Sequence, residues 1–353
     1  MRPEIPDVLT ADEIAVTAES ILDDQTDDGL ILWFPGGHSD PWNHVEAAMA
    51  LDTCGYGESA LRAYDWLRRN QHPDGWWHHY YLADGIEDAK IDTNVCSYLA
   101  TGVWHHYLLT GDRSFLETYR PVVERAIDFV LTLQKPGGEI IWARHRDGTP
   151  WSFALLTGSS SILHSMRCAI AIVTELGDAR PDWELDAARL ADALLHRPDA
   201  FEPKHRWAMD WYYPVLAGPL TGDEADRRLD EGADRFVMPG KGVRCVSDNP
   251  WVTAAETSEC AMAYAQLGRH DEAVELMASI AHLRTDDGAV HTGIVYPQLA
   301  TFPDAERSTY TAAAVVLAAD ALSRATPASG LFVDDESLPQ LIDIRAAEEL
   351  ERD

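Results

Sequence analysis

Aromatic and polar side chains gather in the segments that join the predicted helices. Nine of the twelve tryptophans lie in these segments or in the first turn of the following helix, with His, Asp, Asn and Arg nearby in the chain. A flat indole ring beside polar groups suits stacking against a sugar ring, and flat apolar walls also suit a polyene. The alternative is that these rings only pack the loops against one another. The nine are Trp33, Trp42, Trp76, Trp77, Trp142, Trp151, Trp207, Trp211 and Trp251.

Three carboxylates in the same segments are candidates for acid and base chemistry. Asp210 opens the densest aromatic and carboxylate patch of the chain, the run Asp-Trp-Tyr-Tyr. Glu256 lies one turn inside a helix of small apolar residues, where a charge is costly unless it is paired or functional. An internal ion pair with Arg244 or Arg307 is the alternative for Glu256. Glu306 precedes the last predicted helix and could serve only as its N-terminal acid.

Metal chemistry has little support in the sequence. His38 and His44 are close enough in the chain to share a metal, but no third ligand accompanies them at a recognisable spacing. The five cysteines are widely spaced and contain no Cys-x-x-Cys pair, which favours reduced structural thiols. We therefore expect no metal and no organic cofactor.

The elements that must position these residues are helices of two alternating kinds. Six predicted helices are amphipathic and charged, so each has a face in water: residues 11–25, 58–71, 113–134, 183–196, 223–236 and 270–283. Each is followed by a helix that is apolar on most sides and is therefore expected to be buried: residues 42–53, 93–109, 159–176, 211–218, 253–267 and 309–323.

Short and long connections alternate along the chain. Several buried helices end at a glycine and turn at once into the next exposed helix. The segments from an exposed to a buried helix are long, and three of them begin with a Gln-to-Gly run followed by Trp: residues 25–33, 71–76 and 134–142. A fainter copy, Arg-Thr-Asp-Asp-Gly, occupies residues 284–288.

Six helical hairpins with one elaborated end predict an all-α fold, an (α/α)6 toroid in which an inner ring of helices stands within an outer ring. An open helical solenoid is the alternative. In the toroid all long loops lie on one face, which is where a site is expected. We expect one toroid domain over residues 1–325 and a peripheral acidic extension over residues 326–353.

This face supplies the expected ligand contacts. Asp92 fits the N-cap of its helix, and the N-termini of the inner helices point toward the cavity mouth, so a cap there can also face a ligand. The side chains expected to stack on a substrate are Trp42, Trp77, Trp211 and Tyr212, and those expected to hold hydroxyl groups are His44, Asp92, Arg244 and Asp248.

The overall charge narrows the range of partners. A formal net charge of −31 repels phosphate backbones and anionic lipids, so neither nucleic acid nor a membrane is expected as a partner. The N-terminus lacks the features of a targeting segment and no long apolar stretch occurs, so we expect a cytoplasmic protein acting on a small molecule or an oligosaccharide. The sequence does not define an oligomeric state.

One run of residues resembles a known superfamily. Asp92-Thr-Asn94, followed by residues 104–116 and 121–129, is similar to the second and third hairpins of glucoamylase-like six-hairpin glycoside hydrolases. The resemblance extends more loosely through Trp142 to Glu306, and it implies carboxylate-assisted hydrolysis of a glycoside. Glu306 matches the position of the general base in that family.

The position of the family's general acid departs from the pattern, because Ala143 and Arg144 follow Trp142. The acid must then come from elsewhere, with Asp210, Glu256 or Glu139 as candidates. The hypothesis is that Glu306 activates water while Asp210 or Glu256 donates the proton.

Two other functional classes remain open at this point. The Gln-to-Gly runs also resemble the repeats of terpenoid cyclases and prenyltransferases, which share the toroid and act on isoprenoids. The cyclase motif Asp-x-Asp-Asp is missing from the sequence, and so is the zinc-binding Asp, Cys and His triplet of the protein prenyltransferases at the matching hairpins. The departure at the acid position favours the third class, a non-catalytic glycan-binding toroid.

Overall fold

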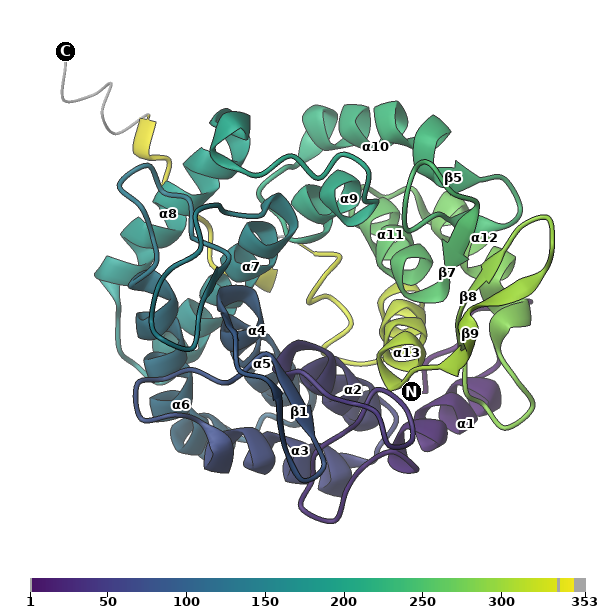
Figure 1. Ribbon diagram of the computed structural model, residues 1–353, viewed down its shortest axis with the longest axis horizontal. Helices are drawn as coiled ribbons and strands as arrows, with labels where there is room; N and C mark the ends of the chain where they lie inside the picture. Colours follow the sequence, from purple (N-terminus) through teal and green to yellow (C-terminus); the bar gives the residue numbers. More distant parts are fainter. Residues whose placement is uncertain (1, 335–336, 346–353) are drawn as a thin grey trace.

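The computed structural model describes residues 2–334 and 337–345 and forms a closed double ring of helices (Figure 1). The outer ring contains α1 (Ala11–Leu22), α3 (Gly57–Asn70), α6 (Arg113–Leu131), α8 (Pro181–His196), α10 (Gly222–Phe236) and α12 (His270–Ile280). The inner ring contains α2 (Pro41–Thr53), α4 (Thr93–Ser97) with α5 (Leu99–Thr110), α7 (Leu156–Glu175), α9 (Met209–Leu216), α11 (Ala254–Gln266) and α13 (Thr309–Ser323). The predicted (α/α)6 toroid is confirmed, and the open solenoid is excluded because α13 packs against α2.

The second inner helix differs from the prediction in one detail. A single helix was expected over residues 93–109, but the structure divides it at Tyr98 into α4 and α5. Tyr98 keeps helical backbone angles, with φ −67° and ψ −18°, so the division interrupts the hydrogen-bond ladder without turning the chain away.

The Gln-to-Gly runs fasten neighbouring outer helices together. In the first three hairpins the Gln Nε2 atom donates to the Gly carbonyl of its own loop and to a carbonyl of the next outer helix. In the fainter copy Arg284 takes the place of Gln, and its Nε atom donates to Oγ1 of Thr17 on α1, at 2.9 Å. The last hairpin is thereby tied to the first. The runs that resembled cyclase repeats are architectural in this chain.

Each of these runs needs a glycine for two reasons. Gly29, Gly75, Gly138 and Gly288 all have φ between +88° and +103°, a region that strains other residues. A methyl group at any of them would also overlap a backbone carbonyl of the neighbouring outer helix. Glycine therefore lets the loop lie directly against the next helix.

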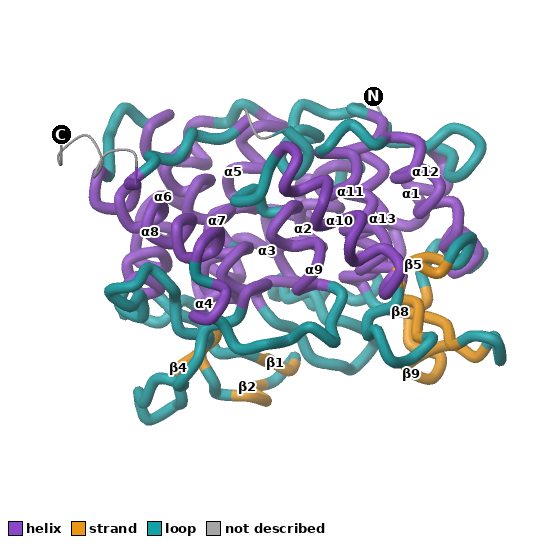
Figure 2. Tube along the Cα trace, turned by 90° about the horizontal axis from the view of Figure 1, so that it is seen from above, coloured by secondary structure: helices purple, strands orange, loops and turns teal. Residues whose placement is uncertain are grey.

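The long connections lie on one face and carry short antiparallel strands (Figure 2). Two-stranded sheets pair β1 (Tyr80–Leu82) with β2 (Gly85–Asp88), β3 (Ile91–Asp92) with β4 (Ala143–Arg144), and β5 (Val237–Met238) with β6 (Gly242–Val243). A three-stranded sheet joins β7 (Trp251–Thr253), β8 (His291–Val295) and β9 (Ala300–Arg307). Single turns of 3-10 helix occupy η1 (Pro198–Ala200) and η2 (Ala281–Leu283).

The C-terminal extension is not peripheral. After α13 the chain crosses the middle of the ring (Figure 1), and Leu331, Val333 and Leu338 belong to the main buried core. His164 on α7 stacks on Phe332 and donates from Nε2 to the carbonyl of Leu331, at 3.0 Å. The expectation of a peripheral tail is therefore wrong for these residues; residues 335–336 and 346–353 of the extension lie outside the described chain.

Candidate functional site

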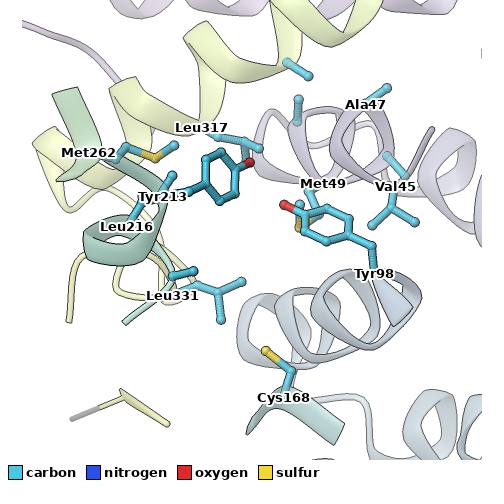
Figure 3. Close-up of a cluster of buried hydrophobic side chains, with 14 of the residues drawn as sticks. Val45, Ala47, Met49, Tyr98, Cys168, Tyr213, Leu216, Met262, Leu317 and Leu331 are labelled. Atoms are coloured by element: carbon cyan, nitrogen blue, oxygen red, sulfur yellow. The ribbon is translucent and has the colours of Figure 1, made fainter. Parts of the chain in front are cut away.

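Two glutamates occupy the floor of the central hollow. Glu46 lies on α2, and its Oε1 atom accepts hydrogen bonds from Trp42 Nε1 at 3.0 Å and from the Tyr98 hydroxyl at 3.1 Å. Glu259 lies on α11 and accepts from the hydroxyl of Tyr213 at 2.8 Å and from that of Tyr212. Figure 3 shows the hydroxyls of Tyr98 and Tyr213 pointing toward one another across this hollow.

The pKa values of both carboxyls are raised. Burial raises the pKa of Glu46 to about 7. Burial, and then the charge of Glu46, raise the pKa of Glu259 well above its ordinary value. The cavity between them offers about 20 Å³ to the centre of a water molecule, which is room for one or two waters and too little for a sugar ring.

A third carboxylate, Asp40, is the N-cap of α2. It lies at the end of the ring where the inner helices begin, which we call the mouth. Its Oδ1 atom accepts from the backbone N–H groups of Trp42 and Asn43, and its Oδ2 atom accepts from Trp33 Nε1 at 2.9 Å and from Asn43 Nδ2 at 2.7 Å. Burial raises the pKa of Asp40 while these hydrogen bonds oppose the rise. The carboxyl is therefore fixed in orientation by four donors.

Glu256 and Glu306 both act electrostatically on Tyr310 of α13. Burial, followed by the charge of Glu256, raises the pKa of Tyr310, and the charge of Glu306 adds to the rise. The ring of Tyr310 packs on that of Trp33, with centroids 4.8 Å apart, and Trp33 is the side chain that donates to Asp40. The aromatic pair of Trp33 and Tyr310 thus joins three carboxylates at the mouth.

Glu256 lies in the first turn of α11. It keeps some contact with solvent, yet burial raises its pKa. The ion pair considered from the sequence is absent from the described residues, because Arg307 pairs with Asp287 at 2.6 Å and Arg244 donates to the carbonyl of Ser247 at 3.4 Å.

Asp92 caps α4 at the opposite side of the mouth. Its Oδ1 atom accepts from the backbone N–H groups of Asn94 and Val95, at 3.0 and 3.2 Å. Burial raises its pKa to about 6, although hydrogen bonds and the charge of Lys90 oppose the shift. His79 Nδ1 lies 4.0 Å from Asp92 Oδ2. The N-cap predicted for Asp92 is confirmed, and its contact with a ligand stays a prediction.

Several buried polar atoms in the segments around the mouth have no hydrogen-bond partner. Within the described chain these include His79 Nδ1, Asn94 Oδ1 and Ser159 Oγ, which lie in the second long loop or where inner helices begin. Buried polar groups in folded proteins are nearly always paired. A bound ligand rich in hydroxyl groups would satisfy them.

Two predicted contact residues are structural instead. His44 accepts the backbone N–H of Ile31 at Nδ1 and donates from Nε2 to the carbonyl of Ala63, so neither nitrogen is left for a substrate. Burial lowers its pKa to about 4, which keeps the ring neutral. Trp77 is 1% exposed and donates to the carbonyl of Leu67. The predicted roles of His44 and Trp77 are therefore wrong.

Asp210 and Trp211 differ in their surroundings. Asp210 accepts from Thr157 Oγ1 at 2.7 Å and lines a cavity between α9 and α10, and burial raises its pKa, so its role as an acid stays a prediction. Trp211 donates to the carbonyl of Arg228 and stacks on Phe236, so the predicted stacking of Trp211 on a substrate is wrong.

Of the remaining predicted residues, two lie at the floor and two are held in ion pairs. Trp42 and Tyr212 belong to the floor, where each donates to a glutamate rather than offering an open ring face. Asp248 is exposed, and Nε of Arg206 donates to both of its carboxylate oxygens, at 2.9 and 2.8 Å. This surface ion pair gives no support to its predicted contact with a substrate. Glu139 is paired with Arg197 at 3.0 Å.

Among residues 2–334 and 337–345, no three His, Cys, Asp or Glu side chains are grouped so that they could hold a metal ion. The helices in this part of the chain also include no apolar span of membrane-crossing length.

Comparison with known proteins decides among the open classes. The sequence is 50% identical over 330 residues to the MMP endo-(1,4)-3-O-methyl-alpha-D-mannosidase of Mycolicibacterium hassiacum, covering 94% of this chain and 91% of the relative. The chain belongs to this family of mannosidases. It is therefore a glycoside hydrolase, and neither an isoprenoid enzyme nor a non-catalytic binding protein fits this membership.

More distant relatives agree with the mannosidase family. An uncharacterized glycosyl hydrolase of Methanocaldococcus jannaschii is 30% identical over 84 residues, which is 24% of this chain and 14% of that protein. No family model matches the chain.

Solved structures of low identity share the toroid. A glycosidase in complex with glucose matches with a TM-score of 0.69 and 15% identity, covering 91% of this chain and 97% of that one. A D-mannose isomerase matches with a TM-score of 0.69 and 12% identity, covering 87% and 96%. At such identities the match concerns the fold alone.

Proposed function

We propose that this mannosidase-family enzyme cuts within chains of α-1,4-linked 3-O-methylmannose. The observation that carries the proposal is the 50% identity, over nearly the whole of both chains, to a protein named for that activity. The mouth is consistent with a neutral glycan, because Asp40, Asp92, Glu256 and Glu306 give it an acidic character that would repel an anionic ligand.

Glu256 is the proposed general acid. A general acid must hold its proton near the working pH and remain within reach of the glycosidic oxygen. Glu256 fits both demands, because burial raises its pKa while its side chain keeps contact with solvent.

Glu306 is the proposed general base, with Asp40 as the competing assignment. Glu306 Oε1 accepts from Thr292 Oγ1 at 2.9 Å, and no second hydrogen bond is found to its carboxylate among the described residues, so it has room to bind a water. Asp40 already accepts four hydrogen bonds, so its lone pairs are occupied. Asp40 accepts from Trp33, and the charges of Glu256 and Glu306 both raise the pKa of Tyr310, whose ring packs on Trp33.

The test is hydrolysis of methylmannose polysaccharide by Glu256→Gln, Glu306→Gln and Asp40→Asn. The first two should each lose about 10²- to 10⁴-fold in kcat, as is usual when a general acid or base is removed. Asp40→Asn keeps a side chain that caps α2 and should retain most activity. Asp248→Asn, which breaks only an exposed ion pair, is the control.

The outcomes separate the assignments. If Asp40→Asn is inactive and Glu306→Gln is active, Asp40 is the base. If Glu256→Gln cleaves at the normal rate, the assignment of the acid is wrong. If the unsubstituted enzyme leaves the polysaccharide intact, the proposed substrate is wrong.

A further inference from the structure

The long loop before α9 exposes a tryptophan that the mouth does not use. Trp207 is 46% exposed, and each of the other eleven tryptophans, all within the described chain, is less exposed. An exposed indole ring leaves a large apolar surface in water, which commonly marks a binding surface. Arg206 lies 5.4 Å from its ring and is itself held by the ion pair with Asp248. The Trp207 ring therefore lies beside an arginine that an ion pair holds in place.

A cavity of about 180 Å³ opens beside this ring. Its far wall is Trp211, which lies directly against Gly232 of α10, where any side chain would collide with the indole. Trp211 is held in place by its hydrogen bond to Arg228 and by its stack on Phe236. Trp211 therefore forms a fixed wall of the cavity, in a position that the absence of a side chain at residue 232 allows.

The charged groups that line the cavity balance one another. Asp210 and Glu231 face Arg228 and Arg235 across it. Arg228 is occupied by carbonyls of Asp210 and Trp211, and Arg235 donates to the carbonyl of His205. Such a lining favours a neutral, hydroxyl-rich ligand over an anion or a cation.

Glu231 supplies an open acceptor at the edge of the cavity. Its side chain is exposed, and among the described residues its carboxylate makes no hydrogen bond and no ion pair. An exposed ring next to an open carboxylate matches the needs of a sugar, whose apolar face stacks and whose hydroxyl groups donate. A 3-O-methyl group would add apolar area to the stacked face.

We propose that Trp207, Glu231 and the cavity beside them form a distal subsite that holds a sugar residue of the glycan remote from the bond that is cut. The inference rests on the proposed function, because an enzyme that cuts within a chain must hold sugars on both sides of the cleavage point. Trp207 lies in the long connection between η1 and α9, and the long connections lie on the same face of the ring as the mouth (Figure 2). A short oligosaccharide would fill the mouth and leave the distal subsite empty.

The experiment compares substrates of two lengths. Trp207→Ala and Glu231→Ala are assayed on methylmannose polysaccharide and on the shortest 3-O-methylmannose oligosaccharide that the unsubstituted enzyme cleaves. Trp207→Ala should raise KM for the polysaccharide roughly ten-fold, and Glu231→Ala should raise it by a smaller factor. KM and kcat for the short substrate should stay unchanged in both variants. Leu61→Ala, which alters a side chain of similar exposure on α3, is the control and should change neither substrate.

Other outcomes overturn the proposal. Equal KM changes for both substrates would mean that Trp207 acts on the mouth, and no change for either would mean that no glycan binds there. A shift in sedimentation of Trp207→Ala relative to the unsubstituted enzyme would mean that the ring contacts a second copy of the chain. Failure of the unsubstituted enzyme to cut either substrate would instead refute the proposed function, which keeps the two failures distinct.

Discussion

The long loops contain two regions of polar side chains that differ in how fully their polar atoms are hydrogen-bonded. In the Gln-to-Gly runs that begin these loops, each Gln amide donates to two carbonyls, and in two of them an Arg of the next outer helix donates back to the Gln oxygen. At the mouth, buried atoms such as His79 Nδ1 and Asn94 Oδ1 have no hydrogen-bond partner in the described chain. The paired Gln amides hold neighbouring hairpins together, and the unpaired atoms at the mouth are free to meet a ligand.

The largest expected effect concerns the ring-building region. Gly75→Ala should destabilise the protein by about 3 kcal/mol or more, because it combines a strained backbone angle with a clash against the carbonyl of Arg125. Thermal or urea unfolding measures the loss. Gly111→Ala is the matched control, since its φ of +66° is also left-handed but no atom lies near the added methyl group. Equal losses in the two variants would show that the contact with Arg125 carries no cost.

Replacing the glutamine of one of these runs should destabilise the protein less than the glycine substitution. Gln71→Ala removes the part-buried hydrogen bonds to the carbonyls of Gly75 and Val122 and the acceptor of Arg125, which together should cost about 1–3 kcal/mol. The rate of glycan hydrolysis per folded molecule should not change. A fall in kcat at full folding would contradict the separation of the two regions.

A substitution at the mouth should reduce hydrolysis and leave stability nearly unchanged. Asn94→Ala removes an atom that has no partner in the free protein, so stability should change by less than about 1 kcal/mol. Hydrolysis should fall roughly ten-fold if a substrate hydroxyl group donates to that oxygen. Urea unfolding and polysaccharide cleavage, measured on the same preparation, provide the two values. Loss of stability with normal hydrolysis would place Asn94 with the ring-building residues.

The same contrast explains what the sequence could and could not predict. The hairpins were predictable because helical periodicity and the alternation of charged and apolar helices extend over many turns. The strands were not, because segments such as Ile91–Asp92 are too short to carry a period. The helix-capping role of Asp40 and Asp92 was also predictable, since Asp directly before a helix is a local signal.

The site was harder to predict because orientation is not a local property. Trp77 and Trp211 lie in the expected loops, but each indole N–H reaches a backbone carbonyl, which turns the ring into the protein. Glu46 and Glu259 were missed since a single acid on a buried helix gives no sign of a partner on another helix. Their pairing depends on the closure of the ring, which brings α2 and α11 to opposite sides of the same hollow.

The smallest expected effect concerns Glu46 at the floor of the site, and it is measured as the change of stability with pH. Glu46 has a folded pKa of about 7, above its ordinary value, so the folded protein binds more protons than the unfolded chain between about pH 4.5 and pH 7. Stability should therefore fall as the pH rises through this window. Glu46→Gln resembles the protonated form and should flatten that decline. The effect is small, because Glu259 remains and still titrates at raised pH. Urea unfolding at pH 5, 6 and 7 measures the slope, and an unchanged slope in the variant would show that Glu46 is ionised throughout, with the proton held by Glu259 alone.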